Sequence, residues 1–241
     1  MAEAQTAGVP GWVLDEMAHA GRENLDPDHV TRYDLKEDAG AEAEVALLRA
    51  HGLAPDATLV DMGAGTGQVA LAAAPTCGRV VAVDVSPVML ARLRAQVEAA
   101  GRHNVEVVHA GFLTYDHQGP PADVVYSRWA LHHLPDMWKV VALRRMRGLL
   151  RPGGLLRLSD VAFAFDPSEV EERIEAWCAA YPDRSASGDD WVRTDVEEHV
   201  RDEHSTFTWL LEPMVERCGF RIEDASHSDD GLTAAYLARA V

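Results

Sequence analysis

Hydrophobic positions form a repeating strand–helix pattern from Thr58 onward. Short runs rich in Val, Ala and Leu alternate with stretches of helical periodicity. The run 79–85 is almost wholly Val and Ala, as expected of a strand that is covered on both faces. The pattern predicts strands over 58–62, 79–85, 105–109, 122–127 and 155–161, separated in part by helices over 66–74, 87–100 and 137–150. This alternation is typical of βαβ units, with a parallel sheet and right-handed crossovers.

The pattern changes on either side of this repeat. A helix is predicted over 41–50, preceded by about 40 polar residues with one short helical patch over 12–19. The stretch 166–203 carries 13 acidic and 4 basic residues and predicts two or three amphipathic helices, which we interpret as an inserted cap. A helix over 206–218 and two strands, 220–226 and 233–240, follow. The predicted division is an N-terminal segment 1–40, a core 41–162, an insertion 163–205 and the rest of the core sheet in 206–241.

Composition narrows the possible partners. The chain has 241 residues, 47% hydrophobic and 25% charged, and its formal charge is −17. This composition is that of a globular protein, and the negative charge argues against nucleic acid and anionic membranes as partners. We see neither a leader sequence nor an apolar run long enough to span a bilayer, and therefore expect a cytoplasmic protein. The three cysteines, Cys77, Cys178 and Cys218, have no spacing that predicts a disulfide framework or a zinc site.

A glycine-rich turn follows the first predicted strand. Gly63, Gly65 and Gly67 alternate with small residues, and Asp61 precedes them. A dinucleotide-binding loop that starts at Gly63 would need glycine at position 68, which is Gln68 here. An acid beside the loop disfavours a pyrophosphate and suits a cationic ligand. A tight strand-to-helix connection without a ligand is the alternative.

Asp84 ends the second predicted strand, 19 residues after Gly65. A carboxylate at this distance from a glycine loop can accept hydrogen bonds from both hydroxyls of a ribose. The alternative is that Asp84 only stabilises the start of the next helix. The combination of loop and carboxylate favours a nucleoside ligand.

Four segments, 60–68, 81–87, 123–134 and 149–154, resemble motifs of the class I S-adenosylmethionine-dependent methyltransferases, in their small-molecule (methyltransferase type 11-like) branch. The resemblance implies an α/β fold: a Rossmann-like three-layer αβα sandwich. Its seven-stranded, mostly parallel sheet has the order 3-2-1-4-5-7-6, and the insertion forms a helical cap on it. The implied cofactor is S-adenosylmethionine, which leaves as S-adenosylhomocysteine.

The resemblance also implies roles for individual residues. Asp61 holds the amino group of the cofactor, Asp84 binds the ribose hydroxyls and Val85 packs on the adenine. Gly63, Ala64 and Gly65 line the methionine and ribose portions, whereas Ser127 and Arg128 contact the methionyl end. Tyr33 resembles a tyrosine that closes over the cofactor in some relatives, with simple core packing as the alternative.

The sequence departs from the family pattern after the third strand. Many relatives carry an acid there that accepts a hydrogen bond from the adenine amino group, but this chain has Gly111 and Phe112. We expect Phe112 to pack against the ring and a backbone group to meet the amino nitrogen.

Methyl transfer depends mainly on alignment and exclusion of water, so a general base is optional. His132 and His133 are the candidate catalytic residues, with packing at a helix start as the alternative, and His204 is a weaker candidate. No metal site is expected, because adjacent histidines rarely share one ion and the sequence shows no third ligand at a fitting distance. Aromatic residues in and just beyond the insertion, Trp177, Tyr181, Trp191 and Trp209, suggest either a pocket wall or a small core of their own.

The sequence therefore predicts transfer of a methyl group from S-adenosylmethionine to a small molecule. A non-catalytic cofactor-binding module, a methyltransferase that acts on proteins and a nucleotide-linked oxidoreductase remain alternatives. The oligomeric state stays open, with a homodimer as one alternative.

Overall fold

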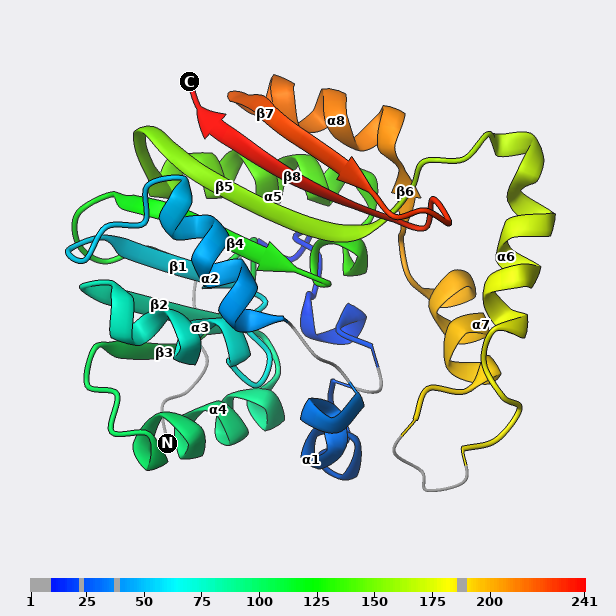
Figure 1. Cartoon of the computed structure of the whole chain (residues 1–241), viewed down its shortest axis with the longest axis horizontal. Helices are drawn as coiled ribbons and strands as arrows, with labels where there is room; N and C mark the ends of the chain where they lie inside the picture. The colour runs from blue at the N-terminus through cyan, green and yellow to red at the C-terminus, as the bar shows by residue number, and fades with distance from the viewer. Residues whose placement is uncertain (1–9, 22–23, 37–39, 186–189) are drawn as a thin grey trace.

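The computed structural model describes residues 10–21, 24–36, 40–185 and 190–241, so the predicted segment 1–40 is described only in part. Its strands form one twisted sheet in the order β3-β2-β1-β4-β5-β8-β7 (Figure 1). Their bounds are β1 Thr58–Met62, β2 Arg79–Asp84, β3 Val105–His109, β4 Ala122–Arg128, β5 Leu150–Phe163, β6 Thr206–Phe207, β7 Phe220–His227 and β8 Thr233–Ala240.

The strand order confirms the predicted sheet. Strands β3, β2, β1, β4 and β5 are parallel, and β8 runs antiparallel between β5 and β7. The short strand β6 lies off this path and pairs with the end of β5. Without β6, the seven remaining strands have the predicted order 3-2-1-4-5-7-6.

Helices cover both faces of the sheet because neighbouring residues of each central strand point to opposite sides. In β2, Val80 and Ala82 pack in one apolar cluster with helices α2, α3 and α4, whereas Val81 and Val83 pack in the other with α5 and α8. The helix bounds are α1 Pro27–Lys36, α2 Ala41–Ala50, α3 Gln68–Ala73, α4 Pro87–Ala99, α5 Asp136–Leu149, α6 Val170–Ala179, α7 Arg193–Asp202 and α8 Thr208–Arg217.

The structure differs from the predicted elements in three places. Helix α1 was not predicted, because its sequence is mostly polar. Strand β5 begins at Leu150 rather than 155 and ends at Phe163 rather than 161. The predicted helix 206–218 begins instead with strand β6, because Thr206 and Phe207 pair with Ala162 and Phe163.

The insertion forms the helical cap that the sequence predicts. Helices α6 and α7 pack on each other at one side of the sheet, near the carboxyl ends of the central strands (Figure 1). Helix α1 lies at the same end. In the described ranges, no helix combines the length and the apolar character that crossing a bilayer requires.

Candidate cofactor and acceptor site

A cavity opens where the parallel strands end, the usual place for ligands in open α/β sheets. The turns that follow β1, β2, β3 and β4 all contribute to its wall. All predicted cofactor residues except Ser127 line it: Tyr33, Asp61, Gly63, Ala64, Gly65, Asp84, Val85, Gly111, Phe112 and Arg128.

The glycine turn requires glycine for two separate reasons. Gly63 and Gly67 have φ values of +73° and +86°, which side chains of L-residues rarely adopt. A Cβ atom on Gly63 would lie 2.3 Å from the Cβ of Ala130, and one on Gly67 would lie 2.0 Å from Cδ1 of Leu93. The turn therefore packs tightly between β4 and α4 and leaves backbone, rather than side chains, at the cavity wall.

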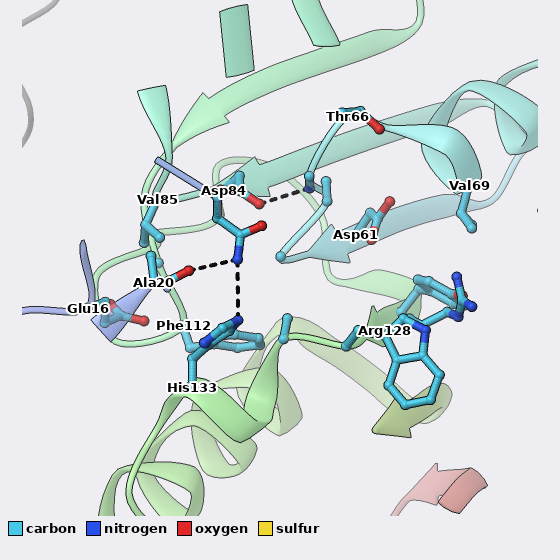
Figure 2. A pocket seen from close by; sticks show the side chains of 18 of the residues that line it. Glu16, Ala20, Asp61, Thr66, Val69, Asp84, Val85, Phe112, Arg128 and His133 are labelled. Atoms are coloured by element: carbon cyan, nitrogen blue, oxygen red, sulfur yellow. Dashed lines mark hydrogen bonds between the residues drawn. The ribbon is translucent and has the colours of Figure 1, made fainter. Parts of the chain in front are cut away.

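Asp84 is held rigidly at the end of β2. Its Oδ2 accepts a hydrogen bond of 2.8 Å from the amide of Gly65 (Figure 2). Its Oδ1 accepts one of 2.7 Å from the amide of Ser86. Burial raises the pKa of Asp84, although these backbone donors partly offset the rise. Each oxygen can accept a further hydrogen bond, so the carboxylate can still receive hydroxyl groups of a ligand.

Asp61 places a second carboxylate in the same cavity. Its side chain is buried, and burial together with the nearby Asp84 raises its pKa to about 7. Two buried acids with raised pKa values make a cationic ligand favourable, since a positive charge offsets both burial and mutual repulsion. A sulfonium compound with a free amino group meets this requirement.

Strand β4 ends at Arg128 and Trp129 follows it, and both residues line the cavity. The guanidinium of Arg128 lies 5.1 Å from the centre of the Trp129 ring. Trp129 has a φ of +51°, and it is the only described non-glycine residue with a positive φ. Strained backbone of this kind is found mainly at functional sites. Ser127, which alternates with Arg128 along the strand, is fully buried and lines neither cavity.

The N-terminal segment also contributes residues that sequence reasoning missed. Glu16, Ala20 and Asn24 line the cavity beside the predicted Tyr33. The side-chain amide of Asn24 donates to the carbonyl of Ala20 at 2.7 Å and lies 3.5 Å from Nε2 of His133 (Figure 2). The helical patch over 12–19 is too short to place these residues against the sheet. The absence of an acid after β3 is the signal that could have prompted a search for an acid elsewhere in the chain.

A second cavity, of about 540 Å³, adjoins the first. The two cavities share Asn24, Tyr33, Arg128, Trp129 and His133. The cap supplies the far wall, and three of its four predicted aromatic residues, Trp177, Tyr181 and Trp191, line the cavity. The fourth, Trp209, is 56% exposed and stacks on Phe207 outside it.

The two predicted catalytic histidines have different environments. The backbone amide of His132 donates to Asp160 Oδ2 at 3.0 Å, and its Nδ1 contacts the other oxygen of the same carboxylate. Nε2 of His132 lies 3.1 Å from Oε2 of Glu203. Burial lowers the pKa of His132, but these two carboxylates outweigh burial and raise it, so His132 is held as a cation.

His133 is neutral, because burial and the charge of His132 lower its pKa. It is also the only one of the two that lines both cavities. His204 lines neither, and its backbone amide donates to the carbonyl of His132 at 2.9 Å.

Glu203 is the functional candidate that sequence spacing could not reveal. It follows α7 and lies about 70 positions from the histidine pair, so only the folded cap brings them together. Ligand atoms of His132, His133 and Glu203 all lie within 4.8 Å of one another, a spacing at which they could hold a metal ion. The expectation of no metal site therefore stays a prediction, but the folded chain places a possible third ligand, Glu203, beside the two histidines, which sequence spacing did not indicate.

Comparison with known proteins agrees with this geometry. Residues 59–154 match the family described as "Methyltransferase domain". The chain is 30% identical over 125 residues to 27-O-demethylrifamycin SV methyltransferase of Amycolatopsis mediterranei, a match that covers 48% of this chain and 43% of that protein. It is 35% identical over 127 residues to carboxy-S-adenosyl-L-methionine synthase of Ectopseudomonas mendocina, covering 48% of this chain and 50% of the relative. The chain thus spans about half the length of these curated relatives.

Solved structures share the fold at low identity. Magnesium protoporphyrin IX methyltransferase from Synechocystis, solved with bound S-adenosylmethionine, has a TM-score of 0.65 and 14% identity, covering 97% of this chain and all of that chain. The [4+2]-cyclase SpnF has a TM-score of 0.60 and 17% identity over 83% of this chain and 80% of its own. Residues 59–154 therefore match a methyltransferase domain, and the chain shares its fold with solved S-adenosylmethionine-dependent methyltransferases.

Proposed function

We propose that this protein transfers the methyl group of S-adenosylmethionine to a small-molecule acceptor. The observation that carries the proposal is the pair of adjoining cavities. One has the glycine turn and two acids that suit the cofactor, and the other has the aromatic wall that suits an organic acceptor. They share residues at a common boundary, where a methyl group could pass from one to the other.

The residues of the first cavity fit the cofactor. Asp84 would bind the ribose hydroxyls, and Asp61 would bind the amino group directly or through water. Gly63, Ala64 and Gly65 leave room for the part of the cofactor that links its ribose to its amino group. Val85 and Phe112 would pack on the adenine. Arg128 and Tyr33 lie at the boundary with the second cavity. We do not assign Ser127 a contact, because it lines neither cavity.

The protein's main contribution would be alignment. S-adenosylmethionine, when bound, supplies a methyl group on a positively charged sulfur, which an acceptor attacks in line. The walls around the shared boundary orient the acceptor and exclude water, and such alignment can supply about 7–11 kcal/mol of the barrier reduction. No oxyanion hole is needed, because charge disperses rather than develops in this reaction.

His133 is the proposed catalytic residue of the pair. It is neutral and lines both cavities, so it can accept a proton from, or orient, an acceptor group at the boundary. His132 is a positioning residue, because Asp160 and Glu203 engage both of its ring nitrogens. It fixes the turn that presents its neighbour.

The experiment is an assay for S-adenosylhomocysteine formed by the purified protein with a broad panel of amines, phenols, acids and thiols. Formation of a methylated product by the wild type, with kcat at least about tenfold lower for His133→Ala, would support the proposal. Cofactor binding without any turnover would favour the non-catalytic module. Methylation of peptides alone would favour a protein acceptor. The SpnF likeness adds a further control, rearrangement of an acceptor without methyl transfer, which mass spectrometry of the same samples detects.

The net charge bears on the kind of partner that the protein binds. A chain with a formal charge of −17 is a poor partner for nucleic acid, so the proposed partner is a small molecule. A cytoplasmic location remains a prediction from the sequence, and the oligomeric state stays open, with a homodimer as one alternative. We also propose that the described parts of segments 1–40 and 163–205 act as covers over the core, since residues from both parts line the cavity walls.

A further inference from the structure

The N-terminal turn inserts one carboxylate into the cofactor cavity. Glu16 immediately precedes the 3-10 turn Met17–His19, and its side chain reaches the loop that follows β3. Its Oε2 accepts a hydrogen bond of 3.0 Å from the amide of Leu113. Only 8% of Glu16 is exposed, and among the described residues its other oxygen, Oε1, has no hydrogen-bond partner. One buried oxygen of this carboxylate is therefore available to a ligand.

Gly111 makes room for this carboxylate. A Cβ atom at position 111 would lie 2.3 Å from Cδ of Glu16, closer than any real side chain allows. Gly111 has an ordinary backbone conformation, so space rather than φ requires the glycine. The residue at which family relatives carry an acid is thus small here, and an acid from another part of the chain lies directly against it.

Glu16 lies at one end of the cavity, with Asp61 and Arg128 toward the other (Figure 2). Asp84 lies between these ends, and the apolar side chains of Val85 and Phe112 lie on the Glu16 side of it. When Asp84 holds a ribose, the base attached to that ribose extends toward Val85, Phe112 and Glu16. A flat apolar slot with a hydrogen-bond acceptor at its end matches a purine that carries a donor on its edge.

The energetics point to the same kind of ligand. A buried oxygen without a hydrogen-bond donor destabilises the protein, and a ligand that supplies the donor removes this penalty. Burial raises the pKa of Glu16 to about 7, although the amides of Leu113 and Phe112 partly offset the rise. A donor from the ligand would favour the ionised carboxylate.

We propose that Glu16 accepts a hydrogen bond from the exocyclic amino group of adenine, and that the N-terminal turn is therefore part of the cofactor site. The inference rests on the proposed cofactor site and replaces the backbone contact expected from the sequence. It assigns the adenine contact to a segment that lies about 95 positions before the loop after β3.

The test compares two ligands by calorimetry on the full chain: S-adenosylhomocysteine, and its analogue with hydrogen in place of the adenine amino group. The wild type should bind the analogue about 10- to 100-fold more weakly, the range expected for a hydrogen bond to a charged group. Glu16→Ala should bind both ligands alike. Gly111→Ala should do the same, because its methyl group displaces the carboxylate while Glu16 itself remains.

Asp15→Asn is the matched control. Asp15 belongs to the same turn, and its Oδ1 accepts a hydrogen bond of 3.2 Å from the amide of Met17, but it does not line the cavity. This variant should keep the preference for the amino group. Thermal unfolding of each variant shows whether it folds, and the wild-type comparison needs no substitution at all.

Two results would overturn the inference in different ways. Equal binding of both ligands by the wild type would exclude the Glu16 contact while leaving the cofactor site intact. Failure of S-adenosylhomocysteine and S-adenosylmethionine to bind at all would refute the proposed function, and the inference with it.

Discussion

Asp84 serves the fold and the ligand with one carboxylate. It accepts hydrogen bonds from Gly65 and Ser86, and it faces the cavity. We expect Asp84→Asn to weaken S-adenosylhomocysteine binding at least tenfold, because an amide can neither accept from both backbone groups nor take two hydroxyls. Asp123→Asn is the control, since that carboxylate accepts from the Thr58 amide at 2.9 Å at the opposite end of β4. Calorimetry measures both, and unchanged affinity in Asp84→Asn would contradict the ribose contact.

Gly67 carries both a backbone and a packing requirement. With φ at +86° and Leu93 Cδ1 2.0 Å from the position of a Cβ, Gly67→Ala should lower the free energy of unfolding by on the order of 2–4 kcal/mol. Gly52→Ala separates the two effects. Gly52 has a φ of +115° but no atom near its Cβ position, so only the strain applies and the loss should be smaller. Urea unfolding would show which variant loses more free energy of unfolding. Equal losses in Gly67→Ala and Gly52→Ala would mean that the close contact with Leu93 of α4 contributes nothing.

The sequence was sufficient to predict the position of a candidate residue where that residue followed a regular element. Asp61 and Asp84 end predicted strands, so the carboxyl edge of the sheet was enough to bring them together. Glu16 lies in a short helical patch of the N-terminal segment and Glu203 at the end of the insertion, and nothing in the local sequence says which part of the sheet either residue meets. Tertiary packing decides that, and a single sequence does not encode it in spacing.

At the scale of elements, Glu203 joins the cap to the core. Its carboxylate contacts His132 of the turn Leu131–His133 and His199 of α7. Burial raises the pKa of Glu203, but hydrogen bonds from these two side chains and the charge of His132 outweigh burial and hold it well below the usual range. The next residue reinforces the junction, since its backbone carbonyl contacts the ammonium of Lys139. The cap is therefore attached through a short, buried and charged contact.

We expect Glu203→Gln to loosen the cap without affecting the cofactor. Removal of one charge from a buried pair leaves the other uncompensated, so amide protection in α6 and α7 should fall by about tenfold or more. Affinity for S-adenosylhomocysteine should stay within about twofold, because Glu203 does not line the first cavity. Glu171→Gln, on the exposed face of α6, is the control. Hydrogen exchange followed by mass spectrometry measures amide protection. Unchanged protection in α6 and α7 would show that Glu203 does not hold the cap on the core.

The regular part of the fold was predictable because both faces of its strands are covered. Runs such as 79–85 have few alternatives once helices flank them, and the order of the sheet followed from the family resemblance. Helix α1 and strand β6 were missed for a common reason: each owes its conformation to neighbours elsewhere in the chain. Thr206 and Phe207 have a helical sequence context, but the end of β5 offers them a strand partner.

For the whole molecule, the buried acids couple cofactor binding to protons. The pKa values of Asp61 and Glu16 are both about 7 in the free protein, so each carboxyl is largely protonated at pH 6. An ammonium group or an N–H donor favours the ionised form, so binding lowers these pKa values and releases protons. Affinity for S-adenosylmethionine should therefore increase as the pH rises from about 6 to 8.

The measurement is calorimetry at pH 6.5 in two buffers of different ionisation enthalpy. Release of protons on cofactor binding by the wild type, with fewer protons released by Asp61→Asn, would support the coupling of binding to ionisation. Uptake of protons, or no dependence on buffer, would contradict it.

The turn that carries Glu16 also bears on how the spent cofactor leaves. Several contacts hold this segment on the core, among them the hydrogen bond from the Leu113 amide to Glu16, the stacking of Trp12 on Trp138 and the hydrogen bond of 2.5 Å from Ser86 Oγ to the carbonyl of Asn24. If adenine is bound beneath the turn, S-adenosylhomocysteine can dissociate only after these contacts break. Release of S-adenosylhomocysteine, rather than methyl transfer, would then limit the rate of turnover. Accumulated S-adenosylhomocysteine would inhibit the enzyme.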